Sequence, residues 1–222
     1  MNFPCIKLCF SGAFNLRPPR PKLCPSWSVQ QVLDLLKKWS PAPSLDLKCL
    51  TLKTSMLVAL ASCKRPSSLS LFSTKEGLCE IGDSVIRLQP TGLEKSEGLN
   101  HTARPLVLHK FGEDPRLCPV TYLKSYLRRT APLRTTDTLF VSLHSPHAGV
   151  GAQSIARWLH KTISQSGQFG TGGSTRAASS SKAMLSGASL AAVLEAGDWA
   201  RVSTFGRFYY KPSSSFQSHV LN

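Results

Sequence analysis

The spacing of apolar residues predicts a chain that is mostly helical. In residues 28–39, Val29, Val32, Leu35, Leu36 and Trp39 fall on one helical face, and Ser28 stands at the N-cap position. Three further helices are predicted over 45–63, 119–129 and 154–166, the first of them more apolar than the others. The chain after them is also expected to be helical, with breaks at Gly187 and Gly197.

Short apolar runs predict a small sheet. The runs SVIRLQP (84–90) and PLVLHK (105–110) flank a polar stretch at 91–104, which is typical of two strands joined by a loop. A further short apolar run, TLFVSL, lies at 138–143, and no internal repeat is visible. The expected fold class is therefore α+β, mainly α, with a small antiparallel sheet.

A proline-rich basic stretch marks the expected domain boundary. Prolines at 18, 19, 21 and 25 deny the segment NLRPPRPKLCP both helical and sheet hydrogen bonds. We expect an N-terminal tail over 1–24, one main domain over 25–212 and a C-terminal tail over 213–222. The start lacks a clear cleavage site, and no segment approaches the roughly 18 apolar residues of a membrane span, so a soluble, intracellular protein is expected.

Charge changes this picture more than composition does. The 222 residues include 27 Lys and Arg against 12 Asp and Glu, which gives a net charge of +15. Such a balance is typical of proteins that bind a polyanion, and nucleic acid is the first candidate. A basic protein that is merely soluble stays open as the alternative.

Cysteine and histidine suggest no metal centre. The seven cysteines are scattered, without zinc-ligand spacing, and are expected to be buried thiols of a reducing compartment: Cys5, Cys9, Cys24, Cys49, Cys63, Cys79 and Cys118. His144 and His147 have no neighbouring carboxylate or cysteine, so they predict a polar loop.

Four segments carry a family resemblance in a fixed order. They are ALASCKRPSSLSLF (59–72), GLEKS (92–96), STRAASSSKA (174–183) and AGDWARVSTFGRFYYKP (196–212). Together they resemble the catalytic domain of the tyrosine recombinases, the family of phage integrases, and most closely the recombinases of DIRS-type retrotransposons. The resemblance covers roughly residues 25–212, and Trp199 follows Arg176 by 23 positions, as the family pattern requires.

The resemblance implies a role for five residues. Arg65 and Arg176 would bind the non-bridging oxygens of a DNA phosphate, because guanidinium groups offer paired, planar donors. Tyr209 would attack the phosphorus and hold the strand covalently. Lys95 would protonate the departing sugar oxygen, and Trp199 would donate its indole N–H to the phosphate. The two guanidiniums should open into one basic, partly exposed cleft with Trp199 at its edge.

All of these assignments except that of Arg176 have a competitor. Lys110 is a second candidate for the lysine, and Tyr210 for the nucleophile. Arg65 could be a solvated helix end, the Lys95 loop an exposed cluster of charges with Glu94 and Glu97, and Trp199 a core residue.

Two features depart from the family pattern. Gly173 stands where the HxxR motif would have its histidine, so a proton-transfer group is missing, and only about 24 residues precede the catalytic domain, where the family carries a DNA-gripping helical domain. Both suit a relic or a fragment of a mobile element.

Three functions therefore stay open. The first is a DNA strand-exchange enzyme of the nucleus or another intracellular compartment, which acts on double-stranded DNA, as a homo-oligomer if the family pattern holds, without cofactor or metal. The second is an inactive DNA-binding relic. The third is a basic module for RNA or a protein partner, in which Arg65, Arg176 and Tyr209 would not cluster.

Overall fold

The computed structural model describes residues 4–17, 27–95, 97, 102, 104–199 and 202–208. The first part of the chain forms α1 (Pro4–Leu16), α2 (Val29–Lys38), η1 (Ala42–Ser44), α3 (Leu47–Ser62) and α4 (Pro66–Leu69). The strands β1 (Cys79–Ile81), β2 (Val85–Leu88) and β3 (Leu106–His109) follow. The rest forms η2 (Pro115–Leu117), α5 (Pro119–Thr130), α6 (Ala152–Gln165), η3 (Gly172–Ser174), α7 (Thr175–Leu185), α8 (Leu190–Gly197) and α9 (Val202–Phe208). The predicted fold class, mainly helical with a small antiparallel sheet, is confirmed.

Helix α3 is the centre of the main body. Every residue from Leu50 to Ala59 is buried, because α5 and α6 pack on α3 from different sides. Its hydroxyl side chains are satisfied within the protein: Thr51 donates to the Leu47 carbonyl and Thr54 to the Tyr122 carbonyl of α5. The helix begins at the N-cap Asp46 and ends at Cys63, whose φ of 50° lies in the left-handed region. Its C-terminal end therefore turns at Cys63, which is itself buried.

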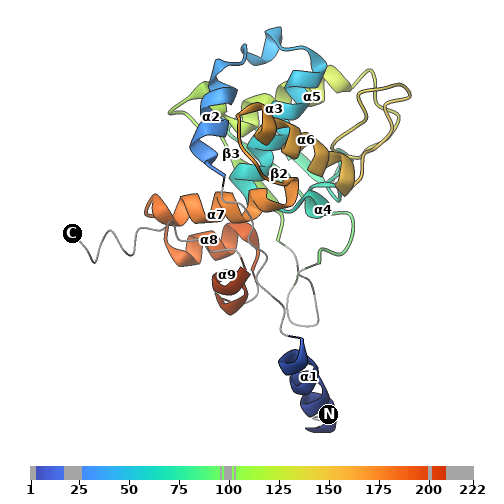
Figure 1. Ribbon diagram of the computed structural model, residues 1–222. Coiled ribbons are helices and arrows are strands. Elements are labelled where there is room, and N and C mark those ends of the chain that lie inside the picture. The colour runs from blue at the N-terminus through green and yellow to red at the C-terminus, as the bar shows by residue number, and fades with distance from the viewer. Residues whose placement is uncertain are drawn as a thin grey trace, which may run out of the picture.

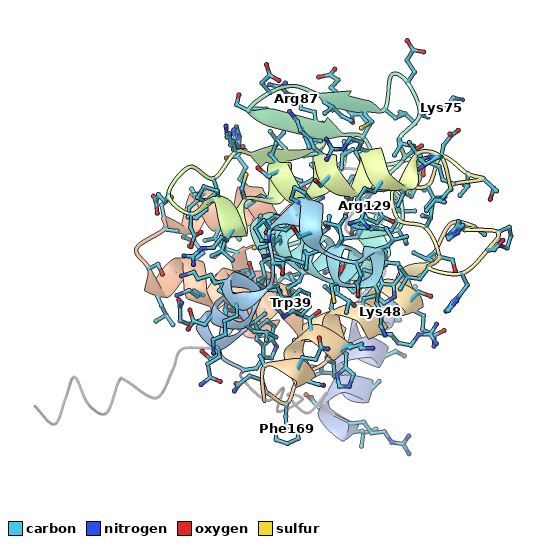
Figure 2. All side chains as sticks on the ribbon, turned by 90° about the horizontal axis from the view of Figure 1, so that it is seen from above. Trp39, Lys48, Lys75, Arg87, Arg129 and Phe169 are labelled. Carbon is cyan, nitrogen blue, oxygen red and sulfur yellow. The ribbon has the colours of Figure 1, made fainter. Side chains whose placement is uncertain are left out.

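The sheet has the order β1-β2-β3, with both pairs antiparallel. Ile86 pairs with Leu108, and both side chains are buried, while Arg87 points outward at the edge of the molecule in Figure 2. The two predicted strands are confirmed, and much of the loop predicted between them lies outside the described residues. Strand β1 escaped prediction because it has three residues and none of them is buried.

The apolar run at 138–143 enters the core without forming a strand. Leu139, Phe140 and Val141 are buried, and the Val141 amide donates to the Tyr126 hydroxyl. The following turn contains His147, whose Nδ1 lies 2.8 Å from the Ser142 carbonyl, so the predicted polar loop is confirmed.

Two sequence expectations need correction or addition. Cys5 and Cys9 are exposed, not buried, because they lie on α1, a helix that the sequence did not predict within the tail. Cys49 and Cys79 are only half-buried, Cys63 and Cys118 are buried as expected, and Cys24 lies outside the described residues. The connector at 18–26 and the tail at 213–222 lie outside the described residues. In the part of the chain that the structure describes, no helix has both the length and the apolar character to cross a membrane.

Candidate active site

The turn after α3 carries the first candidate arginine. The left-handed Cys63 ends the helix, Lys64 turns into the interior, and Arg65 is the half-buried N-cap residue of α4. Pro66 fixes the first position of α4, where its missing N–H has no consequence. The backbone therefore places two consecutive cations on different sides of one turn.

Arg176 lies in the first turn of α7, against this turn. Its Nη1 donates a 2.8 Å hydrogen bond to the Cys63 carbonyl. The side chain is 2% exposed. Burial raises the pKa of the Cys63 thiol, while the Ser179 hydroxyl and the Arg176 charge act in the opposite direction. The positive charge of Arg176 is unfavourable beside the positive end of the α7 dipole. The same arginine and the backbone N–H groups of the first turn together favour an anion at this place.

Trp199 covers Arg176. The guanidinium carbon lies 3.8 Å from the indole ring centroid, which is a cation–π contact, and the ring is 8% exposed. Phe205 of α9 packs edge-on against the indole, with ring centroids 5.0 Å apart. The indole also lies so close to Gly197 that a Cβ there would be 1.8 Å from a ring carbon.

Lys95 lies on the surface, in the loop after β2, and its neighbour Glu94 is buried. Glu94 accepts a 2.7 Å hydrogen bond from Lys64 Nζ and one of 2.6 Å from the Ser68 hydroxyl. The interpretation of this loop as an exposed cluster is therefore wrong for Glu94. Asp198 completes the buried group, with Oδ2 3.6 Å from Lys64 Nζ.

The loop before α7 is fixed from two sides. The indole of Trp27 donates a 2.8 Å hydrogen bond to the Ser174 hydroxyl, and a Cβ on Gly172 would lie 2.2 Å from the Ala156 carbonyl oxygen. Gly173 differs from Gly172. It is exposed, and an added Cβ would meet only the Thr171 hydroxyl, at 3.9 Å.

The five predicted site residues thus have different outcomes. Arg176 and Trp199 are in contact. Arg65 and Lys95 are each one position from a member of the Lys64–Glu94 ion pair, which brings their segments together. Tyr209, like Tyr210, lies outside the described residues. Figure 1 shows α7 and α8 side by side at one end of the body, with α9 beyond α8.

The expected open cleft is not what the structure has at Arg176. Its guanidinium is covered by the indole, because Gly197 leaves room for the ring to lie flat against the end of α8. The sequence analysis also missed Lys64, Glu94 and Asp198 as members of the site. The sequence did contain one indication of their role, because each of these three residues directly precedes a candidate residue. In the described ranges, no group of three or more His, Cys, Asp or Glu side chains is arranged to hold a metal ion.

Comparison with known proteins gives a consistent result at the level of structure alone. No protein-family model matches the sequence, and no curated protein sequence matches it. Among solved structures, the chain is similar to XerA recombinase, with a TM-score of 0.62 and 19% identity over 97% of this chain and 72% of XerA. It is also similar to XerH site-specific recombinase in a pre-cleavage complex with its difH substrate, with a TM-score of 0.60 and 12% identity over 89% of this chain and 53% of XerH.

The fold is that of a tyrosine recombinase catalytic domain. A Flpe variant in complex with a DNA Holliday junction gives a TM-score of 0.50 with 12% identity, and covers 99% of this chain and 57% of Flpe. The chain thus spans little more than half the length of XerH and Flpe. In this recombinase fold, the α3–α4 turn, the loop after β2, the start of α7 and the end of α8 meet in one region.

Proposed function

We propose that this chain is the catalytic domain of a tyrosine recombinase that breaks and rejoins double-stranded DNA. The observation that carries the proposal is the meeting of Arg176 and Trp199 with the segments of Arg65 and Lys95. These four residues come from segments that are far apart in the sequence. The third function, a basic module in which Arg65, Arg176 and Tyr209 do not cluster, receives no support from the approach of the Arg65 and Arg176 segments. Tyr209 lies outside the described residues.

The proposed reaction conserves the energy of the phosphodiester bond. The Tyr209 phenolate oxygen attacks the phosphorus, the bond from phosphorus to the 5′ oxygen breaks, and a 3′-phosphotyrosine forms. Lys95 gives its proton to the departing 5′ oxygen, and Arg65 and Arg176 stabilise the charge on the non-bridging oxygens. Attack of a 5′ hydroxyl on the phosphotyrosine reverses the bond changes and restores the tyrosine.

Lys95 suits proton donation better than Lys64. Lys64 Nζ is held between two carboxylates at 2.7 and 3.6 Å and is buried, so its protons are committed to the protein. Lys95 is exposed on a loop and can reach a ligand outside the body. Because the Trp199 ring covers Arg176, productive binding of a phosphate requires the ring to shift and its N–H to turn toward the phosphate.

The sequence resemblance supports a finer assignment. We place the chain in a DIRS-type mobile element, acting on nuclear DNA as a homo-oligomer. Gly173 favours a second candidate, an inactive DNA-binding relic, because the exposed backbone at this position has no side chain to take a proton from Tyr209.

A suicide DNA substrate separates the two candidates, because it traps a covalent protein–DNA adduct. We expect little adduct with the unmodified chain and roughly 10²–10⁴-fold faster adduct formation with Gly173→His, the usual contribution of a positioned proton-transfer group. The added side chain fits without displacing the loop, since a Cβ at Gly173 has only a 3.9 Å neighbour. The measurement is the rate of adduct formation on denaturing gels.

Two controls sharpen this experiment. Tyr209→Phe in the Gly173→His background should abolish the adduct, and if Tyr210→Phe does so instead, the nucleophile is Tyr210. Efficient cleavage by the unmodified chain would remove the argument for a weakened enzyme. No adduct in any variant that still binds DNA would favour the inactive relic.

A further inference from the structure

A buried cluster of charges lies directly behind the candidate active site. Lys64 is 2% exposed, Glu94 4% and Asp198 3%. Removing charged groups from water costs several kcal/mol per ion, and an apolar cluster of similar volume is often as stable. Stability alone therefore does not explain why three charged residues occupy this position.

The sequence positions of these residues supply a reason. Lys64 directly precedes Arg65, Glu94 directly precedes Lys95, and Asp198 directly precedes Trp199. The three segments belong to different parts of the fold: the turn after α3, the loop after β2 and the end of α8. Consecutive Cα atoms are about 3.8 Å apart, so each of the three buried residues anchors the backbone directly beside one candidate residue.

Further contacts hold each arm of the cluster. The Ser68 hydroxyl donates to the second carboxylate oxygen of Glu94, and the Glu94 amide donates to the Glu97 carboxylate. Asp198 has a φ of 56°, a left-handed conformation that aspartate tolerates better than most residues. Arg176 bonds to the residue before Lys64, and the formal charges of Arg176 and the three cluster residues sum to zero.

We propose that Lys64 is a positioning residue that aligns Arg65, Lys95 and Trp199 through its ion pairs with Glu94 and Asp198. The roles of the three aligned residues rest on the proposed function. The mechanical coupling of their segments rests only on the geometry of the cluster. Loss of the Lys64 charge should therefore loosen two segments that Lys64 does not adjoin in sequence.

Hydrogen exchange measured by mass spectrometry tests the coupling without any need for activity. In Lys64→Met, which keeps an unbranched side chain one atom shorter and removes the charge, amides at 92–95 and 197–199 should exchange about tenfold faster or more. Glu94→Gln, which is the alternative if Lys64→Met does not fold, should speed exchange at 197–199 across the cluster. Lys124→Met is the matched control, because its ion pair with Asp83 is at the surface, and it should change neither segment.

Cleavage in the Gly173→His background tests the positioning role. Lys64→Met should lower the rate of adduct formation by about 10²-fold, the effect of a small misplacement of catalytic groups, with DNA affinity nearly unchanged. Lys64→Arg, which keeps the charge, should recover much of the rate. If Lys64 only stabilised the fold, Lys64→Met would lower the unfolding temperature, and it would not lower the cleavage rate while leaving DNA affinity unchanged.

The two possible failures are distinct. If Gly173→His forms no adduct but exchange at both distant segments rises in Lys64→Met, the proposed function fails and the alignment by Lys64 stands. If faster exchange is confined to residues next to position 64, or if Lys64→Met cleaves as fast as its parent, the alignment is refuted whatever the function.

Discussion

The positions of single side chains at this site are set by close packing as well as by hydrogen bonds and ion pairs. The family resemblance proposed Arg65, Lys95, Arg176 and Trp199 as site residues, and the structure brings Arg176 and Trp199 into contact. The resemblance did not show that Lys64, Glu94 and Asp198 belong to the same site. Charged residues are usually exposed, and only contacts between distant segments show that these three are buried.

Gly197 provides a prediction at this scale. Gly197→Ala should destabilise the protein by about 1–3 kcal/mol, because the new methyl group forces the indole of Trp199 to move. A Cβ at this position would be 1.8 Å from a ring carbon. The measurement is the free energy of unfolding in urea, together with the exposure of Trp199 in a background in which the other tryptophans are phenylalanine.

Gly206→Ala is the matched control. Gly206 also lies in a helix, α9, and a Cβ there would meet nothing within 4 Å. Alanine has the higher helix propensity, so this variant should gain up to about 1 kcal/mol. Equal stabilities of the two alanine variants would show that the indole does not restrict position 197.

At the scale of elements, helices α2, α3, α5 and α6 could be predicted from apolar spacing, and two strands from their flanking turns. α4 and β1 could not, because four and three residues are too few to show a period. The burial of α3 around residues 50–59 was also beyond the sequence, since two of its buried polar side chains, Lys53 and Thr54, find their hydrogen-bond partners on neighbouring helices. Lys53 illustrates this: it is completely buried, and its Nζ donates to the Leu36 carbonyl of α2 at 2.6 Å.

Lys53 should make stability depend on pH. Burial lowers its pKa from 10.5 to about 8. Between these values the unfolded state binds more protons than the folded state, so the free energy of unfolding should rise with pH, by up to about 1.4 kcal/mol per unit. Below pH 8 both states are protonated, and the full penalty of burying the ammonium group remains.

Lys53→Met tests this dependence by urea unfolding at pH 7 and pH 10. The variant should be more stable than the unmodified chain by roughly 1–2 kcal/mol at pH 7, after allowance for the lost hydrogen bond to Leu36, and the difference should vanish toward pH 10. Lys48→Met, at an exposed position of the same helix, should show no such trend. Parallel pH curves for the unmodified chain and Lys53→Met would contradict the assignment.

At the scale of the whole molecule, the net charge of +15 could be read from the sequence, but its distribution could not. Binding to duplex DNA should be largely independent of sequence and should fall steeply with salt, because each neutralised phosphate releases counterions. Arg65→Ala and Lys95→Ala should each flatten the slope of log affinity against log salt by about one unit. Filter binding or fluorescence anisotropy at several salt concentrations gives this slope.

Lys48→Ala is the control for this prediction. Lys48 lies in the first turn of α3, whereas Arg65 follows its last turn, so about 21 Å of helix separates them. Figure 2 shows Lys48 on the face of the body that is seen from above. Its removal should leave the slope unchanged if DNA binds at the candidate site, and a decrease equal to that of Arg65→Ala would place DNA elsewhere.

The hydrogen bond from Trp27 to Ser174 has a mechanical consequence. It joins residues 147 positions apart, and Trp27 is the first described residue of the body after the proline-rich connector. A force applied to the chain on the N-terminal side of Trp27 would therefore act on the loop of Gly173 through the indole ring, and also on α2. A force applied to the connector would thus reach Gly173, the position that the sequence resemblance aligns with the motif histidine.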